Sequence, residues 1–255
     1  MRHLFIISMI LIMNSASAQT LALDLLELKN YEHQLEDVME LVDKTELLAK
    51  IEEVERDYEK NPNEINTVRL GIIYHETALN LSFLSKTEFK GYAKKSYEIL
   101  TKLSVSPGFT KELDPFVVSY SASALSLVAA ETNKLKLLGS AFAIFGKAVD
   151  DYAAVSYLPE FLRGSVAENL PWFFFLKRKA AKHDFQSIVD KFERNPDYAN
   201  SKVMSFTYWA LAKQKQSKTQ RLQSLSYLDK AIALDPDFKA GRAKAEELKA
   251  TMIDR

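Results

Sequence analysis

One short phrase occurs three times in this chain, and its recurrence constrains the fold more than any other feature. The phrase spans Tyr58–Asn63, Phe192–Asp197 and Ile232–Asp237. A large apolar residue four positions before a proline is typical of a helix's last turn, and the Asn or Asp before the proline is pushed out of helical geometry. The acid or amide after the proline can cap the next helix. A recurring stop-and-restart signal indicates an array of helical repeats.

The composition favours long helices. Only 7 glycines and 7 prolines occur among 255 residues, while 47% of the residues are hydrophobic and 27% charged, so helices with buried faces can extend without interruption. The prolines lie where the apolar periodicity breaks, and the breaks come about every 35 to 50 residues, a suitable length for one helical hairpin. The sequence therefore predicts an all-α fold in one continuous domain over residues 19–255.

The first eighteen residues have the pattern of a secretory signal peptide. Arg2 and His3 precede an apolar run over residues 4–13, and the small residues Ala16 and Ala18 precede Gln19, as at a cleavage site. An uncleaved membrane anchor is the alternative, but this run is short where about twenty residues are needed to cross a bilayer. We expect cleavage near Ala18 and a periplasmic or secreted protein.

Cysteine content and charge exclude several classes of site. The chain has no cysteine, which rules out disulfides, thiol nucleophiles, thiolate metal ligands and a cysteine-linked lipid anchor. Its 34 basic residues balance 34 acidic ones. Because nucleic-acid binding depends on a surplus of basic charge, we expect no nucleic-acid partner.

The C-terminal part carries a helical-hairpin pattern. The first helix has an aromatic residue and then a leucine followed by a small residue, here called the Leu-small pair. The second helix has a small residue, a large apolar residue and an alanine, and a proline follows it. These positions are Tyr208, Leu211, Ala212, Ser224, Leu228, Ala231 and Pro236. The pattern resembles the tetratricopeptide repeat, although Lys215 and Ser224 stand where that family usually has tyrosine and alanine. The resemblance implies antiparallel helix hairpins stacked into a right-handed superhelical solenoid.

Two further fragments fit the same repeat. In the first, a helix with Leu70, Gly71 and Tyr74 precedes a partner helix over residues 93–100, with about ten extra residues between them. In the second, a small-residue helix over residues 119–130 precedes Ala141, Phe145 and Ala148. We expect five helical pairs and a terminal helix, residues 238–253, which caps the array because the last pair has no neighbour to cover it.

The resemblance also implies a binding groove, lined by the first helix of each hairpin on the face opposite the Leu-small pair. Carrying these positions over gives two sets of candidate ligand-binding residues. They are Val68, Ile72, His75 and Glu76 in the earlier hairpin, and Phe206, Trp209 and Lys213 in the later one. Trp209 is the expected anchor, since aromatic residues in a groove bury much area at little entropy cost. Packing between helices is the alternative role for Trp209.

No residue pattern predicts catalysis. Three histidines, His33, His75 and His183, follow the signal segment, and none has a second histidine at i+3 or i+4 to form a helical metal pair. His75 and Glu76 are neighbours, so their side chains point about 100° apart on a helix. No nucleophile elbow, phosphate loop or dinucleotide fingerprint is present. We expect a protein that is not an enzyme and has no cofactor or metal.

The run Trp172–Leu176, followed by Lys177, Arg178 and Lys179, allows two interpretations. Five consecutive bulky residues surround a helix, which favours a core helix contacted on several sides. The same run could instead form a membrane-surface patch, with an aromatic belt and a basic flank. We expect the core helix, and hence no membrane contact.

Binding is therefore the expected activity. The first hypothesis is a non-enzymatic periplasmic or secreted scaffold that holds a protein segment or peptide in its concave groove, an argument by fold analogy. The alternative is a periplasmic helper that handles a small apolar molecule or lipid for a transport system, which the 11% aromatic content would suit. If Trp172–Leu176 is buried, the scaffold is favoured; if it lines a tunnel, the carrier is favoured.

Overall fold

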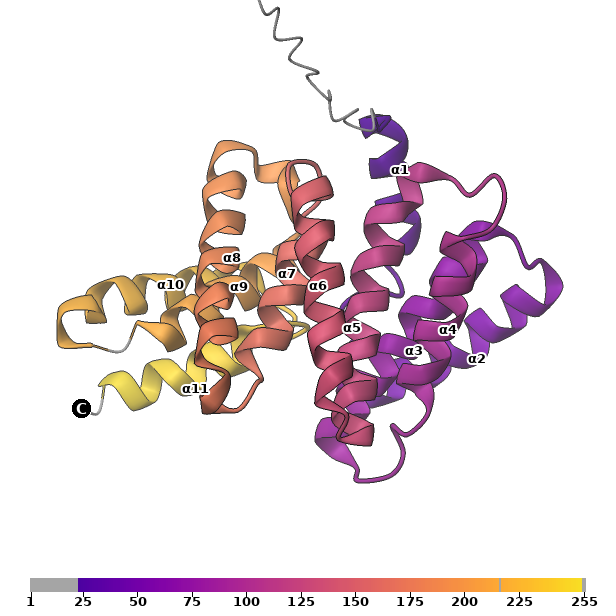
Figure 1. Ribbon diagram of the computed structural model, residues 1–255. Coiled ribbons are helices and arrows are strands. Elements are labelled where there is room, and N and C mark those ends of the chain that lie inside the picture. The colour runs from indigo at the N-terminus through magenta and orange to yellow at the C-terminus, as the bar shows by residue number, and fades with distance from the viewer. Residues whose placement is uncertain (1–22, 216, 254–255) are drawn as a thin grey trace, which may run out of the picture.

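The described part of the protein is built from helices alone. The computed structural model describes residues 23–215 and 217–253, and within these ranges it has eleven α-helices, four short 3-10 helices and no strand (Figure 1). The all-α prediction is confirmed. The predicted signal peptide, residues 1–18, lies outside the described residues.

Helices that follow one another in the chain mostly pack against each other. Pairs form between α3 and α4, α5 and α6, α7 and α8, and α9 and α10, while α2 packs on α3 and α11 on α9 and α10. The bounds are α1 Leu25–Leu35, α2 Lys44–Lys60, α3 Glu64–Leu84, α4 Tyr92–Ser104, α5 Asp114–Thr132, α6 Leu135–Tyr152, α7 Leu158–Glu168, α8 Phe175–Arg194, α9 Ser201–Gln214, α10 Arg221–Leu234 and α11 Arg242–Ile253. The 3-10 helices are η1 Lys111–Leu113, η2 Trp172–Phe174, η3 Pro196–Tyr198 and η4 Lys218–Gln220.

The N-terminal pair differs from the expectation of five hairpins. α1 and α2 do not form a close pair; α1 packs against η1 instead, and the backbone N–H of Asp24 donates to the Glu112 carboxylate at 3.1 Å. α1 therefore stands beside the start of α5 and faces the α8–α9 connection, which lies more than 150 residues further along the chain (Figure 1).

The three repeated phrases each end a helix, but they restart the chain differently. After the first, the Asn63 side chain caps α3 by accepting the Asn66 N–H at 2.9 Å, as predicted. After the second, the chain forms η3, and Asn200 rather than Asp197 caps α9. In the third, the acid before the proline, Asp235, accepts the N–H groups of the next segment at 2.7 to 3.0 Å.

The core is organised around α5. This helix contacts α3, α4, α6 and α7, and small buried residues, among them Ser119, Ala122, Ser123 and Ala124, let these neighbours approach closely. Lys111–Thr132 is also long and apolar enough to cross a membrane, but 72% of its most apolar window is buried inside the protein. A core helix explains that composition.

The predicted contact between the Leu70–Gly71 helix and its partner is present. Leu100 of α4 lies directly over Gly71 of α3, where a Cβ would come within 2.4 Å of the Leu100 Cδ2. The Ser96 hydroxyl donates to the Gly71 carbonyl at 2.7 Å. Only glycine permits this approach without displacing Leu100.

The Trp172–Leu176 run does not form a core helix, and that expectation is wrong. Trp172 is 79% exposed, Phe175 66% and Leu176 71%. The reason is local: the chain leaves α7 through Pro171 and forms η2 before α8 begins, and the buried face of α8 starts only at Ala181.

Gly71→Ala is expected to destabilise the protein by about 1–3 kcal/mol, because the added methyl overpacks the α3–α4 contact. The matched control is Gly139→Ala in α6, where nothing lies within 4 Å of the added Cβ, and where alanine should stabilise by about 0.5–1 kcal/mol through its helix propensity. Urea unfolding measures both. Equal effects of the two substitutions would contradict the close α3–α4 packing.

Candidate functional site: a groove between α1 and α8–α10

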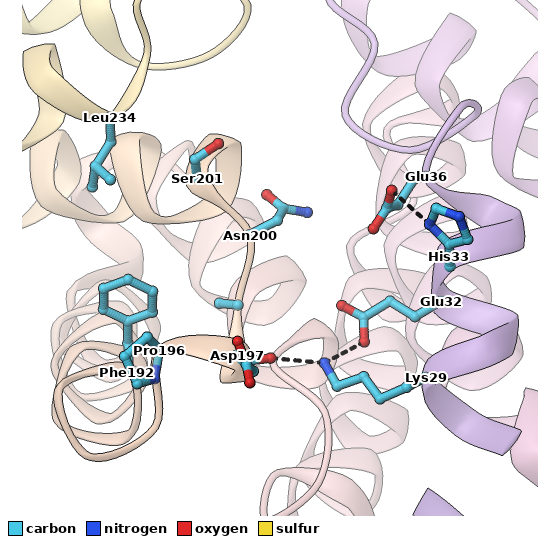
Figure 2. Close-up of a pocket in the computed structure, with 11 residues that line it drawn as sticks. Lys29, Glu32, His33, Glu36, Phe192, Pro196, Asp197, Asn200, Ser201 and Leu234 are labelled. Atoms are coloured by element: carbon cyan, nitrogen blue, oxygen red, sulfur yellow. Dashed lines mark hydrogen bonds and ion pairs between the residues drawn. The ribbon is translucent and has the colours of Figure 1, made fainter. Parts of the chain in front are cut away.

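An open groove separates α1 from the α8–α9 connection. It has a volume of about 470 Å³. Figure 2 shows its two walls, with Lys29, Glu32, His33 and Glu36 of α1 on one side. The opposite wall comes from the end of α8, from η3, from the start of α9 and from the end of α10.

A second hollow extends this groove along α10. It has a volume of about 370 Å³ and shares Phe192, Pro196 and Leu234 with the first, adding Tyr208 and Lys230 among others. The two hollows therefore form one surface, here named the α1–α10 groove. Its shared apolar residues belong to the second and third repeated phrases, so the segments that end α8 and α10 also build the groove.

Lys29 crosses the groove and joins its walls. Its ammonium contacts the Glu32 carboxylate at 2.6 Å and donates to the Asp197 carbonyl at 2.9 Å (Figure 2). On the same helix, His33 Nδ1 lies 3.2 Å from the Glu36 carboxylate. Burial raises the pKa of Glu32, while its contact with Lys29 opposes that shift. The α1 wall therefore carries two carboxylates, those of Glu32 and Glu36, and its lysine, Lys29, already contacts Glu32.

A polar cluster beside the groove ties three distant segments together. The Asn200 side-chain N–H donates to the Glu40 carboxylate at 3.1 Å, and the Tyr157 hydroxyl donates to the other Glu40 oxygen at 3.3 Å. Asn200 also lines the groove and caps α9. Through these contacts the α1–α2 loop, α7 and α9 hold a fixed relative position.

Glu40 has an uncommon backbone conformation and a carboxyl group whose pKa is raised. Its φ of 57° lies in the left-handed region, which is uncommon for residues other than glycine. Burial raises the pKa of its carboxyl to about 7, and the Glu76 carboxylate adds to that shift, whereas Lys202 and the hydrogen bonds from Asn200 and Tyr157 oppose it. Glu40 therefore titrates near neutral pH.

The four candidates from the earlier hairpin lie inside the protein. Val68, Ile72 and His75 are fully buried and Glu76 is 4% exposed, because α3 is covered by α2, α4 and α5. They do not line an open groove and cannot meet a partner on the surface.

His75 and Glu76 instead take part in a buried polar cluster. His75 Nε2 lies 2.7 Å from the Ser123 hydroxyl, and its Nδ1 lies 3.3 Å from the Glu76 carboxylate. The Asn80 side chain donates to Glu76 at 3.3 Å and to the Leu41 carbonyl at 2.7 Å. This cluster fastens the α1–α2 loop to α3 and α5.

The three candidates from the later hairpin lie together on α9. The rings of Phe206 and Trp209 are 5.1 Å apart, and both are half-buried. The ammonium groups of Lys213 and Lys244 lie 5.3 and 4.9 Å from the Trp209 ring. Trp209 thus contacts Phe206 and Lys213 of its own helix and Lys244 of α11, which favours its alternative role in packing between helices. Burial, together with the Lys213 charge, lowers the pKa of Lys244.

The sequence contained only part of the signal for the α1–α10 groove. The repeated phrases containing Phe192, Pro196 and Leu234 predict helix ends, as the structure shows. No sequence pattern indicates that Lys29 of α1 contacts Asp197, which lies 168 residues further along the chain. Within the described residues, no group of three or more histidine, aspartate or glutamate side chains is placed to hold a metal ion.

Glu40→Gln is expected to remove a pH dependence of stability. In the folded protein this carboxyl holds its proton up to about pH 7, whereas in the unfolded chain it loses it near its ordinary pKa of about 4.3. The folded state therefore binds more protons between these values, and stability falls as pH rises through them.

For the unsubstituted protein the fall should be about 2 kcal/mol between pH 4.5 and 7.5, allowing for some solvent contact. In Glu40→Gln the contribution of Glu40 to this fall should be lost, since the amide does not titrate and can still pair with Asn200 or Tyr157. Urea unfolding across this pH range measures the difference, with the exposed Glu98→Gln as control. Parallel pH profiles for all three proteins would show that Glu40 is not buried as described.

Comparison of the chain with protein-family models, with curated proteins and with solved structures gave no match. The case for a function therefore rests on the geometry and charge of the α1–α10 groove.

Proposed function

We propose that this protein is a non-enzymatic scaffold, similar in architecture to tetratricopeptide-repeat proteins, that binds a segment of another protein in the α1–α10 groove. The observation that carries the proposal is the groove itself, an open surface with carboxylates on its α1 wall and apolar residues on the opposite wall. The pairing of successive helices, the Gly71–Leu100 contact and the packing of α11 on α9 and α10 support the stacked hairpins and terminal cap of this proposal, whose right-handed solenoid is taken from the resemblance. Fold analogy alone would not identify a function.

The wall opposite α1 suits apolar side chains. Phe192 and Leu234 are half-buried and Pro196 is exposed, and all three border both hollows. Each hollow falls within the usual size range of ligand sites, about 300–1,000 Å³. An extended peptide could therefore place one apolar side chain in each hollow and continue over Pro196 between them.

The charges of the groove favour a basic segment. Glu32, Glu36 and Asp197 border the first hollow and Glu193 the second, against two lysines. Both lysines already contact a carboxylate. The Lys29 ammonium contacts Glu32, and the Lys230 ammonium lies 3.4 Å from the Glu193 carboxylate. An incoming lysine or arginine would meet a local excess of carboxylates, which speeds association and fixes orientation. We infer a partner segment that combines basic and apolar residues.

The carrier alternative has less support. The observation that would favour it is a Trp172–Leu176 run lining an internal tunnel, and this run faces outward instead. The scaffold proposal retains the predicted periplasmic or secreted location, where such a protein would hold partners together in the cell envelope.

Selection from a phage-displayed random-peptide library tests the proposal. We expect the enriched peptides to contain Lys or Arg next to aliphatic or aromatic residues. They should bind the double variant Glu36→Lys/Asp197→Lys at least about tenfold more weakly, corresponding to about 1.4 kcal/mol, and their affinity should fall as salt is added. Both substituted residues are exposed, so the fold should persist.

The matched control is Glu52→Lys/Glu98→Lys, which changes the net charge equally on α2 and α4, away from the groove. It should lower affinity less than twofold. Peptides that bind both double variants equally well, or a selection that enriches acidic peptides, would refute the proposed site.

A further inference from the structure

One end of the paired helices carries a concentration of exposed apolar side chains. The pairs are antiparallel, so the α3–α4 loop, the α5–α6 turn and the α7–α8 connection come to the same end, away from α1 (Figure 1). The Gly91 N–H donates to the Glu131 carboxylate at 3.1 Å, which joins the first two. The Lys177 ammonium lies 4.0 Å from the centre of the Phe142 ring, which joins α8 to α6.

The exposed residues at this end come from all three connections. Phe83 and Leu84 close α3, Leu135 opens α6, and each is more than 60% exposed. The α7–α8 connection adds the largest group, Trp172, Phe173, Phe175 and Leu176, exposed by 56% to 79%. We name these seven residues the apolar end. Large apolar side chains exposed on three connections at one end of the protein favour an interaction site there.

Two stretches of the chain that contribute to the apolar end contain basic residues and no acidic ones. No acidic residue occurs between Glu131 and Asp150, or between Glu168 and Asp184, although the whole chain is neutral. These two stretches contain seven basic residues, of which Lys134, Lys136, Lys179 and Lys182 are exposed. Among the described residues, none of these four forms an ion pair.

The nearby acids are already engaged. Glu88 pairs with Lys44 at 2.7 Å, and Glu131 accepts the Gly91 N–H. Glu131 keeps its charge, but the four exposed lysines outnumber it, so the local charge at the apolar end is positive. An exposed aromatic cluster with a basic surround matches the interface of a bilayer that contains anionic lipids, where tryptophan and phenylalanine lie among the headgroups and lysines contact the phosphates.

We propose that the apolar end docks on an anionic lipid surface, with Trp172, Phe175 and Leu176 inserted to headgroup depth. The α1–α10 groove lies at the opposite end of the helices, since it is built from α1, the end of α8, the start of α9 and the end of α10. Docking by the apolar end therefore leaves the groove open. This inference does not depend on the peptide-binding proposal, because it uses none of the groove residues.

Vesicle sedimentation tests the proposal with the full chain. Binding is expected to vesicles with about one-third phosphatidylglycerol and to be at least tenfold weaker to pure phosphatidylcholine. Phe175→Ser/Leu176→Ser should weaken binding at least tenfold. The matched control, Leu26→Ser/Val105→Ser, removes equally exposed apolar residues elsewhere and should change binding less than twofold. Residues 1–22 are common to all variants and cannot cause a difference between them.

Tryptophan fluorescence reports the depth of insertion. The chain has two tryptophans, so Trp209→Phe leaves Trp172 as the only one. Its emission should move to shorter wavelength on anionic vesicles, because the indole leaves water. The proposal is overturned if anionic vesicles bind every variant equally, if Trp172 emission does not shift, or if light scattering shows that Phe175→Ser/Leu176→Ser dissolves an oligomer that never binds lipid.

Discussion

The close approach of helices around α5 is the constraint on which the rest of the structure depends. Small side chains on α5 admit α3, α4, α6 and α7, and Gly71 admits Leu100 between α3 and α4. Helices separated by larger side chains would stand further apart, and the polar contacts between segments would then be lost. The cluster of His75, Ser123 and Glu76 forms only because α3 and α5 lie this close.

The antiparallel order of the helices separates two surfaces of different chemistry. One end carries the α1–α10 groove, where carboxylates surround Phe192, Pro196 and Leu234. The other end carries exposed aromatic residues and lysines that form no ion pair within the part of the chain that the structure describes. A neutral chain thus presents an acidic groove and a basic surface at opposite ends of its paired helices.

Local features were predictable from the sequence, and long-range ones were not. The proline phrases located helix ends, and the Leu70–Gly71 pattern identified the contact with Leu100, because both depend on residues within one hairpin. The burial of Val68, Ile72, His75 and Glu76 depends on how many neighbours cover α3, which periodicity does not report. The α1–α10 groove depends on Lys29 meeting Asp197, a contact that no local pattern encodes.

Photo-crosslinking from single positions tests most directly whether a partner binds in the α1–α10 groove. A photoreactive phenylalanine analogue would replace Leu234 in the groove or, in a second variant, Trp209 on α9, in the cells that express the protein. We expect one discrete crosslinked partner from position 234 and none from position 209. A partner captured from position 209 alone would place binding on the α9 face predicted from the repeat pattern and would contradict binding in the groove.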